Sequence, residues 1–213
     1  MRLDVDKMRT EYKGGFLDVS NVDPSPFLQF KIWFDEALNS DIYDPNAMVI
    51  STVSSDGIPS SRTVLIKAYD EKGFVFFTNY KSKKALELEN NPNAVILFPW
   101  FLISRQLIIQ GKAEKISKME SLKYFLSRPF GSKLGAWVSN QSEVISSRKI
   151  LEMKMQEIKA KFKNGDVPIP NNWGGIRVVP RTFEFWQGQP NRLHDRICYT
   201  LYNGSWKIER LAP

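Results

Sequence analysis

The chain of 213 residues contains one cysteine and one histidine, and this scarcity excludes several kinds of site. A lone Cys198 excludes an intramolecular disulfide, a CxxC redox pair and a cysteine-rich zinc site. A lone His194 excludes a histidine-rich metal site, and we expect no bound metal. Such low cysteine usage is typical of a reducing compartment, so the sequence predicts a cytoplasmic protein.

Long apolar runs are also missing. The longest uncharged apolar stretch, AVILFPWFLIS at 94–104, contains a proline and is too short to span a bilayer. The first fifteen residues lack the apolar core of a signal peptide. We therefore expect neither membrane insertion nor secretion.

Several familiar catalytic motifs are absent: there is no GxGxxG, GxxxxGK[ST], HExxH or GxSxG. A Ser/His/Asp hydrolase would have to use His194. The neighbours of this residue in RLHDR are arginines and an aspartate rather than a serine and a buried carboxylate. The sequence therefore disfavours a hydrolase.

Positive charge and aromatic residues are plentiful. Thirty Lys and Arg against 23 Asp and Glu give a net charge of +7, which favours anionic partners. The basic residues form no run of five or more, and most aromatics lie inside apolar runs such as FVFFT and LFPWF. An oligonucleotide-binding barrel needs exposed aromatics interleaved with Lys and Arg, so we expect no nucleic-acid binding.

Hydrophobic periodicity predicts both helices and strands. Helical spacing predicts helices at 27–40, 82–91, 118–128 and 146–165. Apolar runs bounded by turn signals predict strands at 47–53, 59–70, 74–79, 94–102, 105–116, 177–188 and in the Asn203-Gly204 hairpin of 196–211.

About seven strands, mostly antiparallel and with helices inserted between them, favour a closed or split β-barrel, because closure removes exposed sheet edges. The predicted class is α+β, mainly β. We expect a single domain at 26–213. Residues 1–25 are polar and carry turn signals, so they form an arm that wraps the body or stays mobile.

Cations stand at the ends of the predicted elements. Arg62 and Lys67 bound RTVLIK, and strict alternation places them on opposite faces, so we interpret them as two separate anion contacts. In TNYKSKKA, the helix beginning after Ser82 offers free backbone N–H groups beside Lys83 and Lys84, which suits a phosphate. The alternative is a set of solvated surface charges.

Three other groups carry hydrogen-bonding or cationic side chains. Tyr124 and Arg128 are four residues apart on a helix that ends before Pro129, and Ser132 follows. The amides of Gln106 and of the Gln141-Ser142 loop suit the edge of a heteroaromatic ring, which Trp186 would flank. An ordinary surface pair and a core tryptophan are the alternatives.

RLHDR at 192–196 is the third of these groups. If this segment is extended, Arg192, His194 and Arg196 point to one side and Asp195 to the other, giving a face that attracts an anion. The two guanidiniums should disfavour protonation of His194 near pH 7. A solvated turn of charges is the alternative.

Together these stretches resemble the pyridoxamine 5'-phosphate oxidase family, in order and from about residue 45 to 213. The motifs that carry the resemblance are RTVLIK, FVFFTN, SKKA, LFPW, RQLIIQGKAEKI, YFLSRP, GAWVSNQS, VPIPNNWGG, FEFWQG, RLHDR and WKIERLAP. MRTEY resembles the mobile arm of that family.

The resemblance implies a split-barrel homodimer with flavin mononucleotide (FMN) bound at the subunit interface. The implied reaction oxidises pyridoxamine 5'-phosphate or pyridoxine 5'-phosphate to pyridoxal 5'-phosphate by hydride transfer to the flavin, and O2 is reduced to H2O2.

The family's functional positions transfer onto this sequence one by one. Those implied to bind the flavin are Arg62, Val64, Leu65, Lys67, Phe77, Thr78, Lys83, Lys84, Gln106, Gln141, Ser142, Trp186 and Arg196. Those implied to bind substrate are Lys67, Tyr124, Arg128, Ser132, Arg192 and His194, of which Arg192 and His194 are the expected catalytic residues, lying over the pyridine ring.

Two positions depart from the family pattern. SKKA usually reads SRKA, so Lys83 replaces an arginine and loses bidentate phosphate geometry. Phe77 stands where many members have tyrosine. A split-barrel flavin- or haem-related binding protein without oxidase activity is the main rival, but it would not need the substrate-binding residues.

Overall fold

The computed structural model describes residues 11, 12, 14–163 and 165–213. The helices are α1 (Pro26–Leu38), α2 (Lys83–Asn90), α3 (Lys118–Ser127), α4 (Phe130–Val138) and α5 (Arg148–Lys161), with short 3-10 turns at Phe101–Ile103 and Pro190–Arg192. The strands are β1 (Ala47–Val53), β2 (Pro59–Leu65), β3 (Ala68–Asp70), β4 (Gly73–Asn79), β5 (Asn93–Phe98), β6 (Arg105–Lys115), β7 (Trp173–Gln187), β8 (Asp195–Tyr202) and β9 (Ser205–Leu211).

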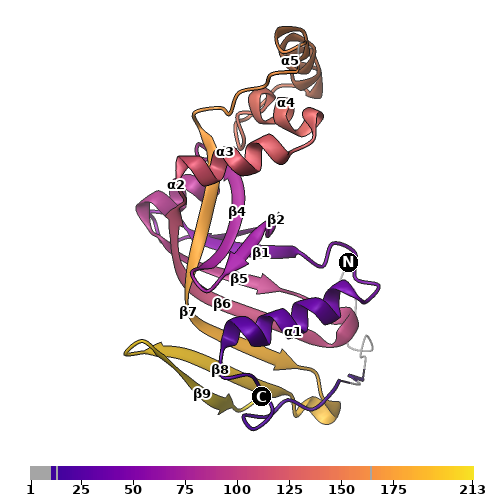
Figure 1. The fold of residues 1–213 in the computed structure, drawn as a ribbon, viewed down its shortest axis with the longest axis vertical. Coiled ribbons are helices and arrows are strands. Elements are labelled where there is room, and N and C mark those ends of the chain that lie inside the picture. Colours follow the sequence, from indigo (N-terminus) through magenta and orange to yellow (C-terminus); the bar gives the residue numbers. More distant parts are fainter. Residues whose placement is uncertain (1–10, 13, 164) are drawn as a thin grey trace, which may run out of the picture. The chain divides into compact units, whose positions relative to one another are not determined.

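The strands belong to one sheet, in the order β2-β1-β5-β6-β7-β4-β3, with β8 paired to β7 and β9 to β8 (Figure 1). The pairs β3–β4, β4–β7, β7–β8 and β8–β9 are antiparallel. Helices are inserted between the strands, so the predicted mainly β, α+β class is confirmed. In the described part of the chain, no helix is both long and apolar enough to cross a membrane.

Tertiary contacts group the described chain into two compact units. The first unit contains the described residues up to Val49, Val95–Gln110 and Pro180–Pro213, and the second contains Ile50–Ala94 and Gly111–Val179. The predicted arm at 1–25 and single domain at 26–213 stay predictions. Residues 1–10 and 13 of that arm lie outside the described residues.

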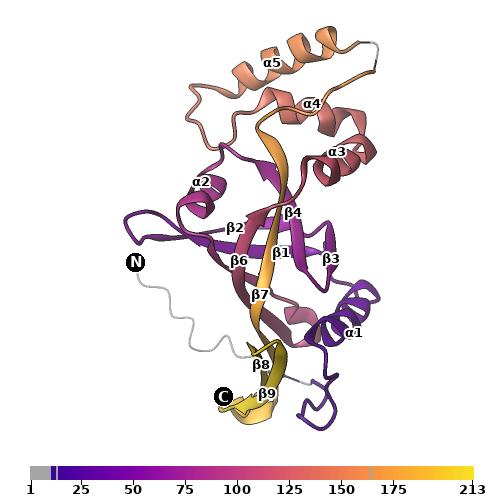
Figure 2. The same cartoon turned by 60° about the vertical axis from the view of Figure 1, so that its left-hand side comes forward.

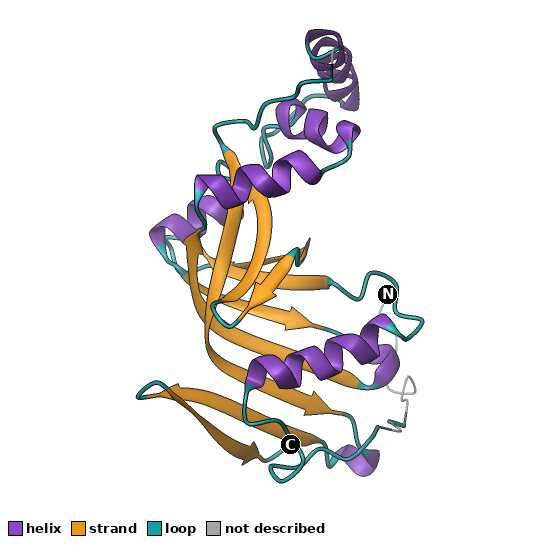
Figure 3. Ribbon diagram, viewed as in Figure 1, coloured by secondary structure: helices purple, strands orange, loops and turns teal. Residues whose placement is uncertain are grey.

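The first unit is built on aromatic packing between α1 and its strands (Figure 3). Residues at helical spacing on α1 are buried, because Phe27, Phe30 and Trp33 recur every three residues. The ring of Trp33 meets Phe185 edge-on at 5.0 Å between centroids, and Phe27 meets Phe183 at 5.2 Å in the same way. Edge-to-face rings of this kind stabilise a core beyond the area they bury.

In the second unit, α3 and α4 lie near the start of β7 (Figure 2), and a core of buried side chains joins them. Phe125, Leu134, Val167 and Trp173 are buried there and bring α3, α4 and the first residue of β7 together. Helix α3 starts at a capping box, in which Ser117 accepts the N–H of Glu120 and the Glu120 carboxylate accepts the N–H of Ser117. This local signal fixes where the helix begins.

Two predicted strands are shorter or broken in the structure, and one helix was not predicted. The strand predicted at 59–70 is broken into β2 and β3, and the one predicted at 94–102 ends at Phe98, because Pro99 cannot continue the ladder and a 3-10 turn follows. Helix α4 was not predicted, since its sequence FGSKLGAWV contains two glycines, which weaken the helical pattern. The Asn203-Gly204 turn is confirmed, and both residues have the positive φ of a tight hairpin.

We predict that Phe185→Ala lowers the free energy of unfolding by about 3–5 kcal/mol, because it empties a fully buried ring site against Trp33 and Tyr199. Urea unfolding at one fixed protein concentration measures this. Tyr202→Ala is the matched control: this ring is 69% exposed, so its removal should change stability by no more than about 0.5 kcal/mol. Equal effects of the two variants would contradict the assignment of the core.

Candidate functional site

A pocket of about 410 Å³ in the second unit gathers most of the predicted site residues. Its lining comprises Arg62, Thr63, Val64, Leu65, Lys67, Phe77, Thr78, Lys84, Tyr124, Arg128, Gln141 and Trp173. A neighbouring pocket of about 330 Å³ shares five of these residues and adds Ser132. Ten of the predicted residues therefore line one cavity and an eleventh lies beside it.

Arg62 and Lys67 line the same pocket, although strict alternation along one strand places them on opposite faces; that they contact two separate anions stays a prediction. The placement on opposite faces assumed one regular strand through both residues. Strand β2 ends at Leu65, and Lys67 lies in the break before β3, where its backbone N–H donates to Val75 O at 2.8 Å. The break ends strict alternation, so both cations reach one cavity.

Lys84 is a buried cation without a carboxylate partner among the described residues. It is 6% exposed, and its Nζ donates to Thr78 Oγ1 at 3.3 Å and to Ser82 Oγ and Gln141 Oε1 at 3.4 Å. Burial, and then the charge of Arg62, lower the pKa of this lysine, against the opposing effect of Glu87. Burying an ammonium among neutral acceptors costs free energy. A site that receives an anion is expected to hold such a buried, uncompensated cation, because the bound anion offsets this cost.

Arg62 is held by a buried carboxylate. Its Nη1 donates to Thr52 Oγ1 at 2.6 Å, its Nη2 donates to Ser60 Oγ, and Nη2 lies 3.4 Å from Glu87 Oε2. Burial alone would raise the pKa of Glu87, but hydrogen bonds from Thr52 and Ser60 and the charges of Arg62 and Lys83 outweigh it, so this pKa is lowered. Glu87 stays ionised and fixes the plane of the guanidinium.

Arg128 has a free buried donor. Its Nη1 is buried and has no hydrogen-bond partner in the described chain, and its guanidinium lies 4.8 Å from the ring centroid of Trp173. Burial lowers the pKa of Arg128 and raises that of Tyr124. The rings of Phe77, Tyr124 and Trp173 stack nearly parallel, with Phe77 and Tyr124 3.9 Å apart. A buried, unsatisfied guanidinium donor calls for an acceptor such as phosphate.

Lys83 and Ser142 meet through the backbone rather than through the lysine side chain. The N–H of Lys83, at the start of α2, donates to Ser142 Oγ at 3.2 Å. Its ammonium is 63% exposed and lies 3.8 Å from Glu87 Oε1. Gln141, next to Ser142, accepts from Thr78 Oγ1 at 3.0 Å. The Gln141-Ser142 loop therefore contacts the start of α2.

The other five predicted residues belong to the first unit. Trp186 and His194 lie 4.6 Å apart between ring centroids, and the edge of Tyr12 contacts both at 5.4 Å. Arg192 lies 6.0 Å from the centroid of Tyr12. These four side chains therefore form one cluster.

Arg196 and Gln106 lie outside that cluster's ring contacts. Arg196 Nε donates to Glu184 Oε1 at 2.8 Å and its Nη1 donates to Ala212 O at 2.7 Å, so part of its fork is already used. Hydrogen bonding to Glu184 raises the pKa of Arg196. Gln106 is half-buried on β6.

The condition that the whole RLHDR segment is extended is not met. Strand β8 begins only at Asp195, and Arg192 ends a 3-10 turn with φ 63°. Strict alternation therefore does not apply to Arg192, and Asp195 is turned into the protein, where it is 7% exposed. The Pro190 ring and the left-handed residue Asn191, with φ 56°, bend the chain before the strand starts.

His194 is held as a neutral ring. Its Nδ1 accepts the backbone N–H of Gln189 at 3.1 Å, so the proton of the neutral ring lies on Nε2. Burial, and then the charge of Arg192, lower the pKa of His194. The direction agrees with the sequence-based hypothesis, but burial rather than the charge of Arg192 is the larger cause.

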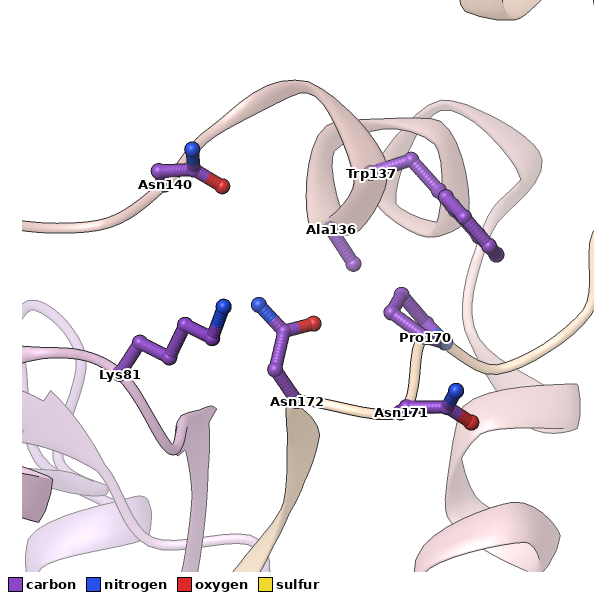
Figure 4. Close-up of a pocket in the computed structure, with 7 residues that line it drawn as sticks. All are labelled: Lys81, Ala136, Trp137, Asn140, Pro170, Asn171 and Asn172. Carbon is purple, nitrogen blue, oxygen red and sulfur yellow. The ribbon is translucent and has the colours of Figure 1, made fainter.

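Another pocket, of about 510 Å³, lies elsewhere in the second unit. Lys81, Asn140 and Asn172 line it with Trp137 and Pro170, and Lys81 and Asn172 point toward one another across it (Figure 4). None of the predicted site residues lines it, and Lys81 is exposed. The pocket of about 410 Å³ is the better candidate, because it holds the buried Lys84 ammonium and the buried Nη1 of Arg128, which lack carboxylate partners among the described residues.

Four residues of these clusters were missed from the sequence. Trp173 forms a wall of the pocket, and Glu87 orients Arg62. Next to His194 in the chain, Asp195 Oδ1 accepts Nη1 of Arg210 at 2.7 Å. A signal existed only for Glu87, which shares the buried face of α2 with Lys84 and Leu88. The other contacts join residues distant in sequence.

An antiparallel sheet with a pocket that holds the Lys84 ammonium and Arg128 Nη1, neither paired to a carboxylate among the described residues, defines a β-barrel class of protein with a site suited to an anion. Residues 34–162 match the model of the pyridoxamine 5'-phosphate oxidase family, and residues 173–213 match the C-terminal dimerisation region of pyridoxine 5'-phosphate oxidase. The chain belongs to the pyridoxamine 5'-phosphate oxidase family, as the sequence predicted.

Full-length relatives support the same assignment. The pyridoxine/pyridoxamine 5'-phosphate oxidase of Aliarcobacter butzleri is 55% identical over 212 residues, covering 99% of this chain and 100% of that protein. The one from Crocosphaera subtropica is 54% identical over 214 residues, with the same coverage.

A solved structure supports the fold. PhzG from Burkholderia lata 383, determined with tetrahydrophenazine-1-carboxylic acid, is 27% identical with a TM-score of 0.89, and the match covers 96% of this chain and 100% of that one. The predicted split-barrel fold of the family is thereby confirmed.

We predict that His194 titrates below its ordinary value of 6.5, since burial and Arg192 both disfavour the charged ring. Because the folded pKa is depressed, the ring contributes stability above the unfolded pKa, and this contribution is lost as pH falls through the folded value. Nitrogen NMR measures it cleanly, because the chain has one histidine. Arg192→Gln should raise the pKa; an unchanged value would show that Arg192 has no effect on the ring.

Proposed function

We propose that this chain oxidises pyridoxamine 5'-phosphate and pyridoxine 5'-phosphate to pyridoxal 5'-phosphate with FMN, and that each of the two groups of residues described above supplies side chains for this reaction. The predicted oxidase activity is confirmed by the full-length relatives named for it, and FMN is the cofactor of this family. When bound, FMN supplies the acceptor for a hydride and passes the electrons to O2, which becomes H2O2.

The observation that carries the proposal is one pocket that holds the buried Lys84 and the buried Nη1 of the half-buried Arg128, neither with a carboxylate partner among the described residues. Both the flavin and the substrate carry a phosphate, and the pocket offers a separate cation for each. Lys84, Arg62 and the Gln141-Ser142 loop with Lys83 hold the flavin phosphate. Lys67, Tyr124, Arg128 and Ser132 hold the substrate phosphate.

The remaining residues orient the rings. The segment Val64–Leu65 with Phe77 and Thr78 forms the wall along which the flavin lies, and Gln106, Trp186 and Arg196 contact its ring system. Arg192 and His194 lie over the substrate's pyridine ring. Hydride transfer from the C4' carbon depends mainly on close stacking and alignment, so these residues act by holding the ring in place and excluding water.

His194 acts as a hydrogen-bond donor in this arrangement. Its Nδ1 is already engaged by Gln189, so Nε2–H is the free group and donates to the phenolic oxygen of the substrate. Arg192 adds a positive charge on the same side, which favours the anionic form of that oxygen.

The assembly is a homodimer, in keeping with the dimerisation region at 173–213. We place the flavin at the interface between two protomers. Cytoplasmic location and the absence of nucleic-acid and membrane partners stay predictions.

The first test is the flavin absorption spectrum of the purified protein, followed by O2-dependent formation of pyridoxal 5'-phosphate from pyridoxamine 5'-phosphate. Arg192→Ala should keep the flavin and lower kcat/KM by roughly 100-fold, because the substrate ring loses its cover. Arg181→Ala, which removes an exposed guanidinium on β7, is the control and should retain activity. Flavin binding without turnover in the wild type would contradict the oxidase assignment.

The two neighbouring lysines should differ in their effect on FMN affinity. Lys84→Met removes a buried charged donor and should weaken binding by about 10- to 100-fold, since such a hydrogen bond contributes about 1.5–3 kcal/mol. Lys83→Met removes an exposed ammonium and should weaken it by less than about fivefold. Quenching of flavin fluorescence on titration measures both affinities.

The apoprotein provides the second readout for these lysine variants. Lys84→Met should leave the melting temperature of the apoprotein unchanged or higher, because it removes an uncompensated buried charge. Equal losses of FMN affinity in both variants, or a less stable Lys84→Met apoprotein, would contradict the role given to the buried ammonium.

A further inference from the structure

Asp195 is the centre of a hydrogen-bond network in the first unit. Its Oδ2 accepts the backbone N–H of Leu17 at 3.2 Å and Nε2 of Gln189 at 2.7 Å. Its Oδ1 accepts Nη1 of Arg210, on β9, at 2.7 Å. Burial would raise the pKa of Asp195, but the hydrogen bonds, that from Arg210 foremost, lower it. The carboxylate is therefore ionised and shared by three partners.

Arg210 carries the network to the segment before α1, which passes beside β8 and β9 (Figure 1). Its Nη2 donates to Leu17 O at 2.8 Å and to Asp18 Oδ2 at 2.7 Å. Gln189 Nε2 donates to Gly15 O at 2.7 Å. Asp195 and Arg210 thus hold both the N–H and the C=O of Leu17.

The same segment touches the loop that follows β7. A Cβ at Gly14 would lie 2.0 Å from Gln187 Nε2, and a Cβ at Gly188 would lie 2.7 Å from the Tyr12 ring. Both glycines are therefore required by close approach of two chain segments. The loop at 188–194 is consequently packed between the segment at 14–18 and the start of β8.

This loop is strained in front of His194. Asn191 and Arg192 are consecutive residues with positive φ, at 56° and 63°. Such conformations are costly for residues other than glycine and persist only where surrounding contacts impose them. The contacts present are Gly188 N–H to Ser104 O at 2.7 Å at one end and the Asp195 network at the other.

Gln189 links this network to the imidazole. Its side chain donates to Asp195, while its backbone N–H donates to Nδ1 of His194. Moving Asp195 therefore moves the residue that sets the proton position on the ring. Arg192 lies between these two contacts in the chain.

We propose that Asp195 and Arg210 are positioning residues for the oxidase reaction. They tie the segment at 14–18 to the loop at 188–194, and so impose the strained turn that presents Arg192 and keeps Nε2–H of His194 free to donate. The effect on catalysis rests on the proposed function of Arg192 and His194. The effect on the ring itself does not.

The test compares Arg210→Gln and Arg210→Lys with wild-type holoenzyme. Lys207→Gln is the matched control, because it breaks the exposed Lys207–Glu209 ion pair on the same strand without touching the loop. Nitrogen NMR of the single histidine reports the tautomer and pKa of His194 without any need for turnover. Kinetics with pyridoxamine 5'-phosphate and titration with FMN provide the other readouts.

Arg210→Gln should give a mixture of His194 tautomers and a raised His194 pKa. It should raise KM or lower kcat/KM by roughly 10- to 100-fold, with FMN affinity unchanged within about twofold. Arg210→Lys should recover part of the loss, and Lys207→Gln should match the wild type. A wild-type histidine spectrum in Arg210→Gln would overturn the proposal, whatever the activity.

Asp18→Asn keeps the test decisive if Arg210→Gln does not fold, because it weakens one outer acceptor of Arg210 and leaves Asp195 in place. A smaller shift of the His194 signals in the same direction supports the proposal, and no shift overturns it. If wild-type protein showed these NMR properties but no oxidase activity, the proposed function would fail while the positioning of the ring stood.

Discussion

The site depends on cations that the protein buries without neutralising them. Lys84 is surrounded by hydroxyl and amide oxygens, and Arg128 keeps one buried donor with no acceptor. Neutral acceptors hold an ammonium in place but leave its charge uncompensated, so the free energy lost on burial is recovered only when an anion arrives. A carboxylate at either position would stabilise the empty protein and compete with phosphate. The requirement to bind an anion therefore lowers the stability of the unliganded protein.

Glu87 shows how one carboxylate is tolerated beside such a pocket. Its carboxylate accepts hydrogen bonds from Thr52, Ser60 and Arg62, so its negative charge is already compensated by these groups. The Nη groups of Arg62 donate to Ile50, Thr52, Ser60 and Glu87, which leaves its Nε–H for a ligand and fixes its plane before any ligand binds. We expect the lysine at position 83, where the family usually has arginine, to change FMN affinity little. The backbone N–H of Lys83 makes the contact with Ser142, and the lysine side chain is exposed.

Local signals in the sequence predicted those parts of the fold that depend on neighbouring residues. The Asn203-Gly204 turn, the strands flanking it and the helix starting after Ser82 were found because their determinants lie within a few residues. The break after Leu65 was not found, and so Arg62 and Lys67 were placed on opposite faces. Tertiary contacts that set the geometry of RLHDR, such as Leu17 with Asp195, join residues 178 apart and leave no local trace.

The candidate site residues were reached by two routes of different strength. Spacing alone indicated cations at strand and helix ends, and only the family resemblance sorted them into two phosphate sites. The structure adds what neither route contained: which cations are paired. Arg62, Arg196 and Arg210 each face a carboxylate, whereas Lys84 and Arg128 face none among the described residues. Pairing depends on packing, which a single sequence does not specify.

The lone histidine of RLHDR is suited to donation and unsuited to general-base catalysis. In the neutral ring Nε2 carries the proton, so any proton taken up would have to enter at Nδ1, and this would break the hydrogen bond from Gln189. Burial and Arg192 oppose that step as well. A proton released by the substrate amine or alcohol must therefore go to solvent or another acceptor. This division suits the proposed reaction, whose barrier is set by hydride alignment, because a ring fixed in one tautomer presents the same donor across the working pH range.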